Sequence, residues 1–365
     1  MTESARAQSY PCQTCGGKLS FDAARGCLVC AHCGAVRSIA AIDATIGEHD
    51  LFEGLATAPR GLGASSMRAA RCQECAATVD FADGLTATRC AFCGSPRVLE
   101  QAENRSLIRP ESLLPFGVDR ARSTLAFVRW IAGLWFRPSD LKGLARVEEL
   151  VGVYVPYWTF DADVESEWDA EAGFHYEVEE TYTDRDGQEK SRRVRRTRWE
   201  SASGNRHDHF DDVLVCASRG LPPDLANSLR TFDTARLVPY APDYLAGWRA
   251  EEYGLDLQHG FRQAKARMDA TQQSRCADDV PGDEHRSLVV RNQYSALTFK
   301  HVLLPVWIAA YRYRDRVFRF LVNGQTGEVV GKAPYSWPKI LAAVVLVAAL
   351  LGLAYLLSRG HGGDL

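Results

Sequence analysis

Two cysteine quartets with the same spacing constrain this 365-residue chain more than any other feature. In each quartet, a Cys-x-x-Cys pair is followed fourteen residues later by a second such pair. Each cysteine of the second quartet lies sixty positions after its counterpart in the first, and other residues match at the same spacing, such as Phe21 with Phe81 and Gly34 with Gly94. This shared spacing indicates an internal duplication. Gly34 and Gly94 each directly follow the second cysteine of a pair. Ala76, which follows Cys75, departs from this pattern. The eight cysteines are Cys12, Cys15, Cys30, Cys33, Cys72, Cys75, Cys90 and Cys93.

The spacing of these cysteines predicts two structural zinc sites. A Cys-x-x-Cys turn places two thiolates on one side of a tight knuckle, and two knuckles about 15 residues apart enclose a tetrahedral four-sulfur site. Disulfides would need an oxidising compartment, and Met1 to Tyr10 contain no signal sequence. Iron–sulfur clusters use other spacings, and a redox dithiol needs one knuckle only. Four sulfur ligands leave no position for a catalytic water, so the Zn²⁺ should stabilise ribbons too short to fold by apolar burial.

Two residues of the first quartet leave its ligands open to a second interpretation. Cys27 could replace Cys30, because Cys27-x-x-Cys30 is also a knuckle. The duplicate has Ala87 at the position that corresponds to Cys27, so the register favours Cys30. His32 lies where the duplicate has Phe92, and we expect it to face solvent rather than to bind the metal.

Composition and charge bound the remaining functions. The formal net charge of −3 provides no general attraction to nucleic acid or to an acidic membrane surface. Nine of the eleven cysteines precede residue 94, and the other two, Cys216 and Cys276, have the context of ordinary thiols. This usage favours a reducing compartment in which cysteines bind metal.

An uncharged stretch of eighteen residues, Ile340 to Leu357, predicts a transmembrane helix. At about 1.5 Å per residue it approaches the ~30 Å hydrocarbon thickness of a bilayer. Trp337 and Lys339 lie at one end of it and Tyr355 and Arg359 at the other, as interfacial anchors would. A buried core helix is the alternative, but the stretch has no polar face. We therefore expect a tail-anchored, single-pass membrane protein whose N-terminal bulk stays in the cytoplasm.

The region between the cysteines and this stretch repeats one plan, which is an apolar-Pro-aromatic segment, a helix, a Pro-x-Trp segment and a hairpin. The two copies have LLPF at 113–116 and LVPY at 237–240, helical patterns at 119–135 and 255–269, and VYVPYW at 153–158 and LLPVW at 303–307. We expect two α+β units, each a helix on a curved antiparallel sheet. The expected organisation is zinc ribbon 1 at 1–40, a linker at 41–70 with a short helix near 42–51, zinc ribbon 2 at 71–100, α+β units at 107–235 and 236–334, a transmembrane helix at 338–358 and a tail at 359–365.

A hairpin from Tyr176 to Trp199 has an acidic first arm and a basic second arm. The basic arm could form a patch for nucleic acid or anionic lipid. Cross-strand pairing of opposite charges on a solvated ribbon is the alternative. We favour the pairing, because the acids are supplied by the adjoining arm.

Motifs for catalysis are missing from the sequence. It contains no P-loop, no His-Glu-x-x-His and no G-x-S-x-G. One other group of residues has side chains that could bind a metal ion or transfer protons. We expect this group to form an exposed polar turn, and a third metal site or an acid–base site is the alternative. The group is His207, His209, Asp211 and Asp212.

The chain resembles a bacterial family of membrane-anchored double zinc-ribbon proteins, often labelled primosomal protein N′ (replication restart helicase)-like. The resemblance is carried by the two quartets, RW at 198–199, FDDVLV at 210–215, LLPVW at 303–307, VNGQTGEV at 322–329 and the closing apolar stretch. Some members look like partners of phage-shock protein A and SPFH-domain (virion-core-like) proteins in a stress-response complex at the inner membrane. The resemblance therefore implies an inner-membrane location and a protein partner of that type, and it identifies no catalytic residues.

The expected function is that of a non-enzymatic, zinc-binding adaptor, anchored in the membrane, which recruits a cytosolic or peripheral protein partner. The alternative is a nucleic-acid-binding zinc-ribbon protein without a motor of its own, in line with the helicase label. The ribbons supply only a modest basic surface for it, including Lys18, Arg25 and Arg89. The fold class expected is two small β zinc ribbons, a duplicated α+β region and one C-terminal transmembrane helix.

Overall fold

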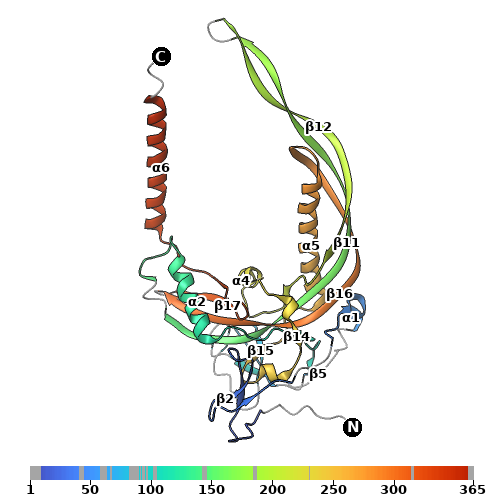
Figure 1. Ribbon diagram of the computed structural model, residues 1–365, viewed down its shortest axis with the longest axis vertical. Helices are drawn as coiled ribbons and strands as arrows, with labels where there is room; N and C mark the ends of the chain where they lie inside the picture. The colour runs from blue at the N-terminus through green and yellow to red at the C-terminus, as the bar shows by residue number, and fades with distance from the viewer. Residues whose placement is uncertain are drawn as a thin grey trace.

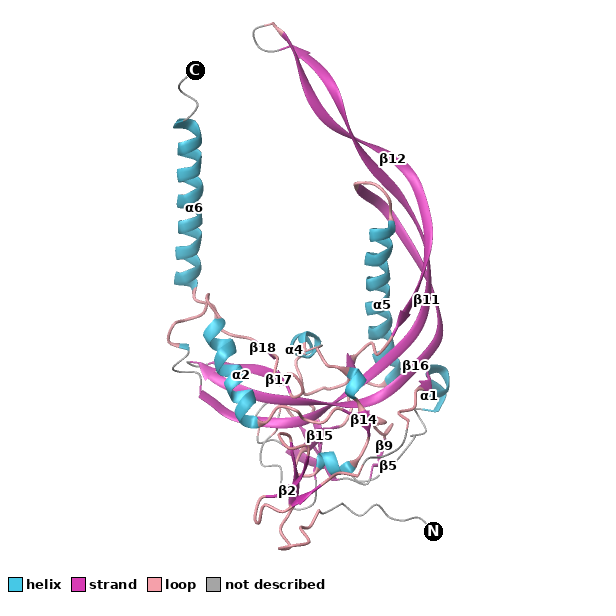
Figure 2. Ribbon diagram, in the orientation of Figure 1, coloured by secondary structure: helices cyan, strands magenta, loops and turns pink. Residues whose placement is uncertain are grey.

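One large mixed sheet dominates the computed structural model, shown in Figures 1 and 2. Its curved spine consists of three long strands, β11 (Arg146–Thr183), β12 (Glu189–Phe210) and β16 (Glu284–Tyr313). The upper parts of these strands form an arm that rises from a platform of shorter strands (Figure 2). The residues described are 10–40, 45–57, 64–65, 68–81, 90, 92, 95, 98–101, 105–141, 146–183, 187–229, 231–313 and 316–360.

The shorter strands and the helices are labelled as in Figure 1. The strands are β1 (Leu19–Asp22), β2 (Cys27–Cys30), β3 (Val36–Arg37), β4 (His49–Asp50), β5 (Ala64–Ser65), β6 (Arg68–Cys72), β7 (Thr78–Phe81), β8 (Val98–Gln101), β9 (Arg105–Ser106), β10 (Ser112–Leu113), β13 (Val215–Cys216), β14 (Val238–Pro239), β15 (Arg249–Glu251), β17 (Arg316–Asn323) and β18 (Val329–Gly331). The helices are α1 (Leu51–Thr57), α2 (Arg120–Gly133), α4 (Pro223–Ser228), the 3₁₀ turns η2 (Thr234–Arg236) and η3 (Pro242–Leu245), α5 (Leu257–Asp279) and α6 (Trp337–Gly360).

The duplicated segments pair with each other, so the predicted fold class is wrong. The two Pro-x-Trp segments lie in β11 and β16, where Tyr154 is opposite Pro305 and Pro156 is opposite Leu303. The two apolar-Pro-aromatic segments also pair, in β10 and β14. Each copy therefore supplies strands to the same mixed sheet, and two separate α+β units do not form. The physical reason is that these segments are buried on both faces, as for Tyr154, which is 0 % exposed, and neither copy can cover its own segments alone.

Helix α5 covers the concave side of the arm (Figure 1). Its N-cap is Asp256, whose side chain accepts a hydrogen bond from the backbone N–H of His259 at 2.8 Å. Ala264 and Met268 face the sheet and are fully buried. The helix continues ten residues beyond the predicted end at 269, because Gln272 remains buried and donates to Ser166 of β11. The sequence pattern did not predict this polar layer.

The linker helix expected near residues 42–51 is found later in the chain, as α1. The side chain of Asp50 accepts a hydrogen bond from the backbone N–H of Glu53 at 2.9 Å and so caps the start of this helix. Leu51 is fully buried against the large sheet. Residues 41–44, in which part of the prediction falls, lie outside the described residues.

Helix α6 extends away from the sheet (Figure 1), and its large apolar side chains, such as Leu346 and Leu351, are exposed. Within the described part of the chain, no helix is long and apolar enough to cross a membrane. This finding overturns the predicted transmembrane helix at 338–358 and the inner-membrane location.

Candidate metal centres

The first quartet forms a compact cluster of thiols. The Sγ atoms of Cys12, Cys15, Cys30 and Cys33 all lie within 4.8 Å of one another. Two Sγ–Sγ distances, Cys12 to Cys33 and Cys15 to Cys30, are 3.6 Å. A tetrahedron of sulfurs about 2.3 Å from a zinc ion has edges of about 3.8 Å, whereas a disulfide bond is about 2.0 Å long. The donor set therefore fits a four-coordinate metal ion.

The backbone of each knuckle is folded to present its thiols. The amide of Cys12 donates to the carbonyl of Gly17 at 2.6 Å, and the amide of Gly16 donates back to the carbonyl of Cys12 at 2.8 Å. Gly16 takes a left-handed backbone conformation with φ of 73°, which this turn requires. The amide groups of Cys15 and Thr14 point at the thiol of Cys12 and lower its pKa to about 6. This favours the thiolate form that binds metals.

The structure decides between the two alternatives that the sequence left open in this quartet. Cys30 belongs to the thiol cluster, as the sixty-residue register predicted, and Cys27 does not. Cys27 lies at the start of β2, opposite Asp22 of β1. His32 is exposed and does not belong to the cluster either, which agrees with the expectation for a knuckle residue.

The second quartet forms a matching cluster from the three of its cysteines that lie among the described residues. Cys72, Cys75 and Cys90 place their Sγ atoms within 4.8 Å of one another, and Cys75 and Cys90 are 3.6 Å apart. This is the distance between the corresponding pair of the first quartet. Cys93 lies outside the described residues and remains a prediction as the fourth ligand. Ala76 takes the left-handed conformation of the knuckle, with φ of 60°, although it has a Cβ atom.

The two ribbons are attached to the same short segment, but in different ways. The first ribbon keeps its own sheet, in the order β1-β2-β3, and docks on residues 243–248. Its contacts are a bond from the amide of Phe21 to the carbonyl of Ala246, a bond from Trp248 Nε1 to the carbonyl of Phe21, and an ion pair between Arg37 and Asp243 at 3.0 Å. The second ribbon joins the large sheet itself, because its strand β7 pairs with β15, which pairs with β11.

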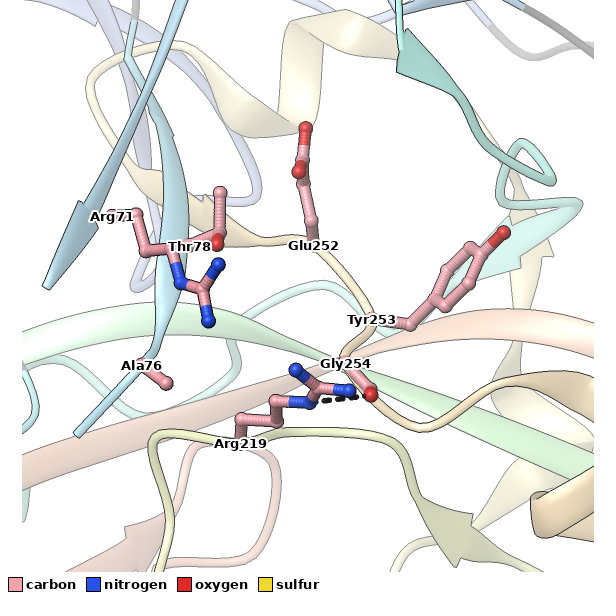
Figure 3. A pocket seen from close by; sticks show the side chains of 7 residues that line it. All are labelled: Arg71, Ala76, Thr78, Arg219, Glu252, Tyr253 and Gly254. Carbon is pink, nitrogen blue, oxygen red and sulfur yellow. Dashed lines mark hydrogen bonds between the residues drawn. The ribbon is translucent and has the colours of Figure 1, made fainter. Parts of the chain in front are cut away.

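A polar pocket of about 160 Å³, whose lining is drawn in Figure 3, is formed partly by residues of the second ribbon. It is lined by Arg71, Ala76, Thr78, Arg219, Glu252, Tyr253 and Gly254. Arg219 is held across the pocket by a bond from its Nε to the carbonyl of Gly254 at 2.6 Å. Arg71 directly precedes Cys72, and Ala76 directly follows Cys75, so this pocket adjoins two cysteines of the second cluster along the chain.

A buried carboxyl group directly precedes the pocket residue Glu252 in the chain. Glu251 is 3 % exposed, and its Oε1 accepts hydrogen bonds from the amides of Arg219 and Gly220 at 3.2 and 3.0 Å. Burial raises the pKa of Glu251 to about 8. Sequence reasoning missed both Glu251 and Arg219, because neither belongs to a motif and their positions depend on strand pairing between distant segments.

The predicted histidine–aspartate group does not come together as a unit. Asp211 and Asp212 lie near Asp161 of β11 instead, with carboxylate oxygens within 4.8 Å. The ammonium group of Lys300 lies 3.0 Å from Asp212 and supplies a positive charge to this group. The two histidines lie on the exposed face of β12, where His209 bonds Asp163 at 2.8 Å. This arrangement is that of a structural ion-pair network.

The acidic and basic arms of the predicted hairpin pair across β11 and β12. Glu180 accepts from Arg192 at 3.3 Å and from Arg196, and Arg193 lies 3.9 Å from both Glu177 and Glu179. The favoured interpretation, cross-strand pairing of opposite charges, is confirmed for these residues.

The fold and the two thiol clusters define a β-rich protein with two cysteine ribbons docked on one sheet. The chain is 27 % identical over 343 residues to a protein of Bacillus subtilis (strain 168) named uncharacterized protein YdjG, and the similarity covers 92 % of each chain. No protein-family model and no solved structure matches this chain. The similarity to YdjG thus extends over most of the chain, and that protein's name states no activity.

Proposed function

We propose that this protein is a zinc-binding adaptor, without catalytic turnover, that presents two metal-stabilised ribbons to a protein partner. The observation that carries the proposal is the pair of matching thiol clusters, each on a ribbon docked to one segment of the large sheet. A closed set of sulfur ligands suits a structural zinc ion, because it leaves no position for a substrate or water. Cys12, Cys15, Cys30 and Cys33 would hold one ion, and Cys72, Cys75, Cys90 and Cys93 the other.

The fixed attachment of the ribbons supports a role in recognition. Rigid surfaces lose little conformational entropy when a partner binds, so a ribbon held on a sheet is better suited to contact than one on a flexible linker. A partner of the phage-shock protein A or SPFH-domain type remains a prediction from the family resemblance. Nucleic-acid binding is the alternative, and the cross-strand ion pairs on β12 weaken it because they neutralise arginines that would contact phosphates.

Metal analysis and partner capture test this proposal together. We expect the purified full-length protein to hold two zinc ions per chain, and the Cys72→Ser, Cys75→Ser double variant to hold one and to lose its crosslinked partner. The matched control is Cys27→Ser, which removes a thiol outside the clusters and should keep both ions and the partner. Wild-type protein without bound zinc, or a partner that the double variant still binds, would contradict the proposal. Salt-sensitive binding to nucleic acid by the wild type would favour the alternative.

A further inference from the structure

The arm has one long strand edge that no described strand covers. Strand β12 pairs with β11 along its whole length, from Ala162 opposite Phe210 to Thr183 opposite Glu189, without a register shift. On its other side, β12 has no partner among the strands that the structure describes. An open edge of this length presents a row of backbone donors and acceptors to which another strand can bind.

The opposite edge of the arm is built differently. Strand β16 shifts its register against β11 at two places in the arm, and Ser287 and Ala296 at these places have positive φ values of 56° and 49°. Such bulges bend a strand and interrupt the row of groups to which another strand would bind. The edge of β16 is therefore protected against added strands, whereas that of β12 is regular.

Charge divides the β12 edge into two halves. From Lys190 to Arg198 the strand is strongly basic, so a second copy paired about this half would bring arginines opposite arginines. From Ser201 to Asn205 the strand has only small, uncharged side chains, in the sequence SASGN. Ser203 at the centre of this half is exposed. The second half therefore provides a centre at which no charged side chains of two copies would face each other.

An antiparallel pairing centred on Ser203 is complementary to itself. If Ser203 lies opposite Ser203 of a second copy, Glu200 lies opposite Arg206 and Arg198 lies opposite Asp208, each twice by symmetry. Arg206 and Asp208 are already oriented by ion pairs to α5 at 2.7 Å. Opposite charges in directly facing positions stabilise a strand pair, and each β12 edge would cover the other.

We propose that two copies of this chain associate through their β12 edges, antiparallel about Ser203, to form one continuous sheet. The interface is isologous, as a two-fold symmetric dimer requires. This association goes beyond the adaptor function, since it would double the number of ribbons in one assembly and increase the avidity for a multivalent partner.

Analytical ultracentrifugation of the full-length chain tests the association. We expect the wild type to sediment as a dimer, and Ser203→Lys to shift it to a monomer because two ammonium groups would face each other. Ser191→Lys is the matched control, since Ser191 is also exposed on β12 but lies outside the self-complementary half, and this variant should remain dimeric. A monomeric wild type, or a Ser203→Lys variant as dimeric as the control, would overturn the proposal.

Cysteine crosslinking tests the register. In the proposed pairing, the two Ser203 Cα atoms lie about 4.5 to 5.5 Å apart, which is within the Cα–Cα range of disulfide bonds. Under a mild oxidant, Ser203→Cys should give a covalent dimer on denaturing gels with at least tenfold more crosslinked chain than Ser191→Cys or the wild type. Equal crosslinking of the two variants would rule out the register centred on Ser203.

Discussion

The two cysteine ribbons share a spacing and a knuckle geometry, yet they are connected to the rest of the molecule in different ways. The first has a three-stranded sheet of its own and meets the platform through side-chain contacts and one backbone bond from Phe21. The second is part of the large sheet, because β7 pairs with β15 and β15 with β11. Segments with the same cysteine spacing can therefore form either a docked module or a part of the core sheet.

The largest effect should follow from the loss of a metal ligand in each ribbon. We expect Cys75→Ser to lower the free energy of unfolding of the large sheet by about 5 kcal/mol, because unfolding the second ribbon removes the partner of β15. The corresponding Cys15→Ser should lower it by about 2 kcal/mol, since the first ribbon contributes packing but no sheet strand. Hydrogen exchange of the amides of Val153 and Tyr154 in β11 reports both values.

The comparison of Cys75→Ser with Cys15→Ser requires that each variant has lost one zinc ion. Metal analysis of the same samples tests this requirement. Equal losses of protection in β11 from the two variants would show that the difference in strand pairing has no energetic consequence. The Cys27→Ser chain serves as the reference for removing a thiol outside both clusters.

A smaller effect concerns the buried carboxyl group of Glu251 under the second ribbon. Its pKa of about 8 in the folded protein is well above that of an ordinary glutamate, so the folded state binds more protons between these two values. Stability from this group is therefore fully present below about pH 4.5 and is lost as the pH rises through 8. We expect the stability of the wild type, relative to Glu251→Gln, to fall by about 2 kcal/mol between pH 5 and pH 7.

Chemical denaturation at a series of pH values measures this difference. The variant is the proper reference, because zinc affinity itself rises with pH and contributes to both chains. Glu167→Gln, a change at an exposed glutamate of β11, provides the control for the removal of a carboxyl group that is not buried. A constant difference between wild type and Glu251→Gln would mean that Glu251 is ionised in the folded protein.

The sequence predicted local features of the fold more reliably than its connections. The helix expected at 119–135 is present as α2, and the two arms of the hairpin expected from Tyr176 to Trp199 pair, because periodicity and alternation act over a few positions. The two α+β units are absent. The alternation of apolar and polar residues in a strand shows which of its faces is buried, but it does not show which other strand pairs with it. Tyr154 and Pro305 are far apart in the chain, and nothing in either segment identifies the other as its neighbour.

The candidate metal centres show the same difference between local features, which the sequence predicts, and contacts between distant segments, which it does not. The sixty-residue spacing correctly placed Cys30 rather than Cys27 in the thiol cluster. It did so because a spacing that occurs in both copies reflects a geometry that both copies must satisfy. The carboxyl group of Glu251 could not be predicted, since its burial depends on Val79 of the second ribbon lying opposite it. The apolar stretch that begins at Ile340 led to the prediction of a transmembrane helix, and this prediction is wrong for the part of the chain that the structure describes.

The smallest effect should come from the one knuckle in which alanine replaces glycine. Ala76 holds a left-handed conformation that costs a residue with a Cβ atom about 1 kcal/mol, and Gly16 at the same place in the first ribbon avoids this cost. We expect Ala76→Gly to raise the zinc affinity of the second ribbon about fivefold, and Gly16→Ala, which meets no atom within 4 Å, to lower that of the first by a similar factor. Competition with a zinc chelator measures both. If Ala76→Gly left the affinity of the second ribbon unchanged, the strain at Ala76 would be offset by its contacts, and the two ribbons would differ only in how they join the sheet.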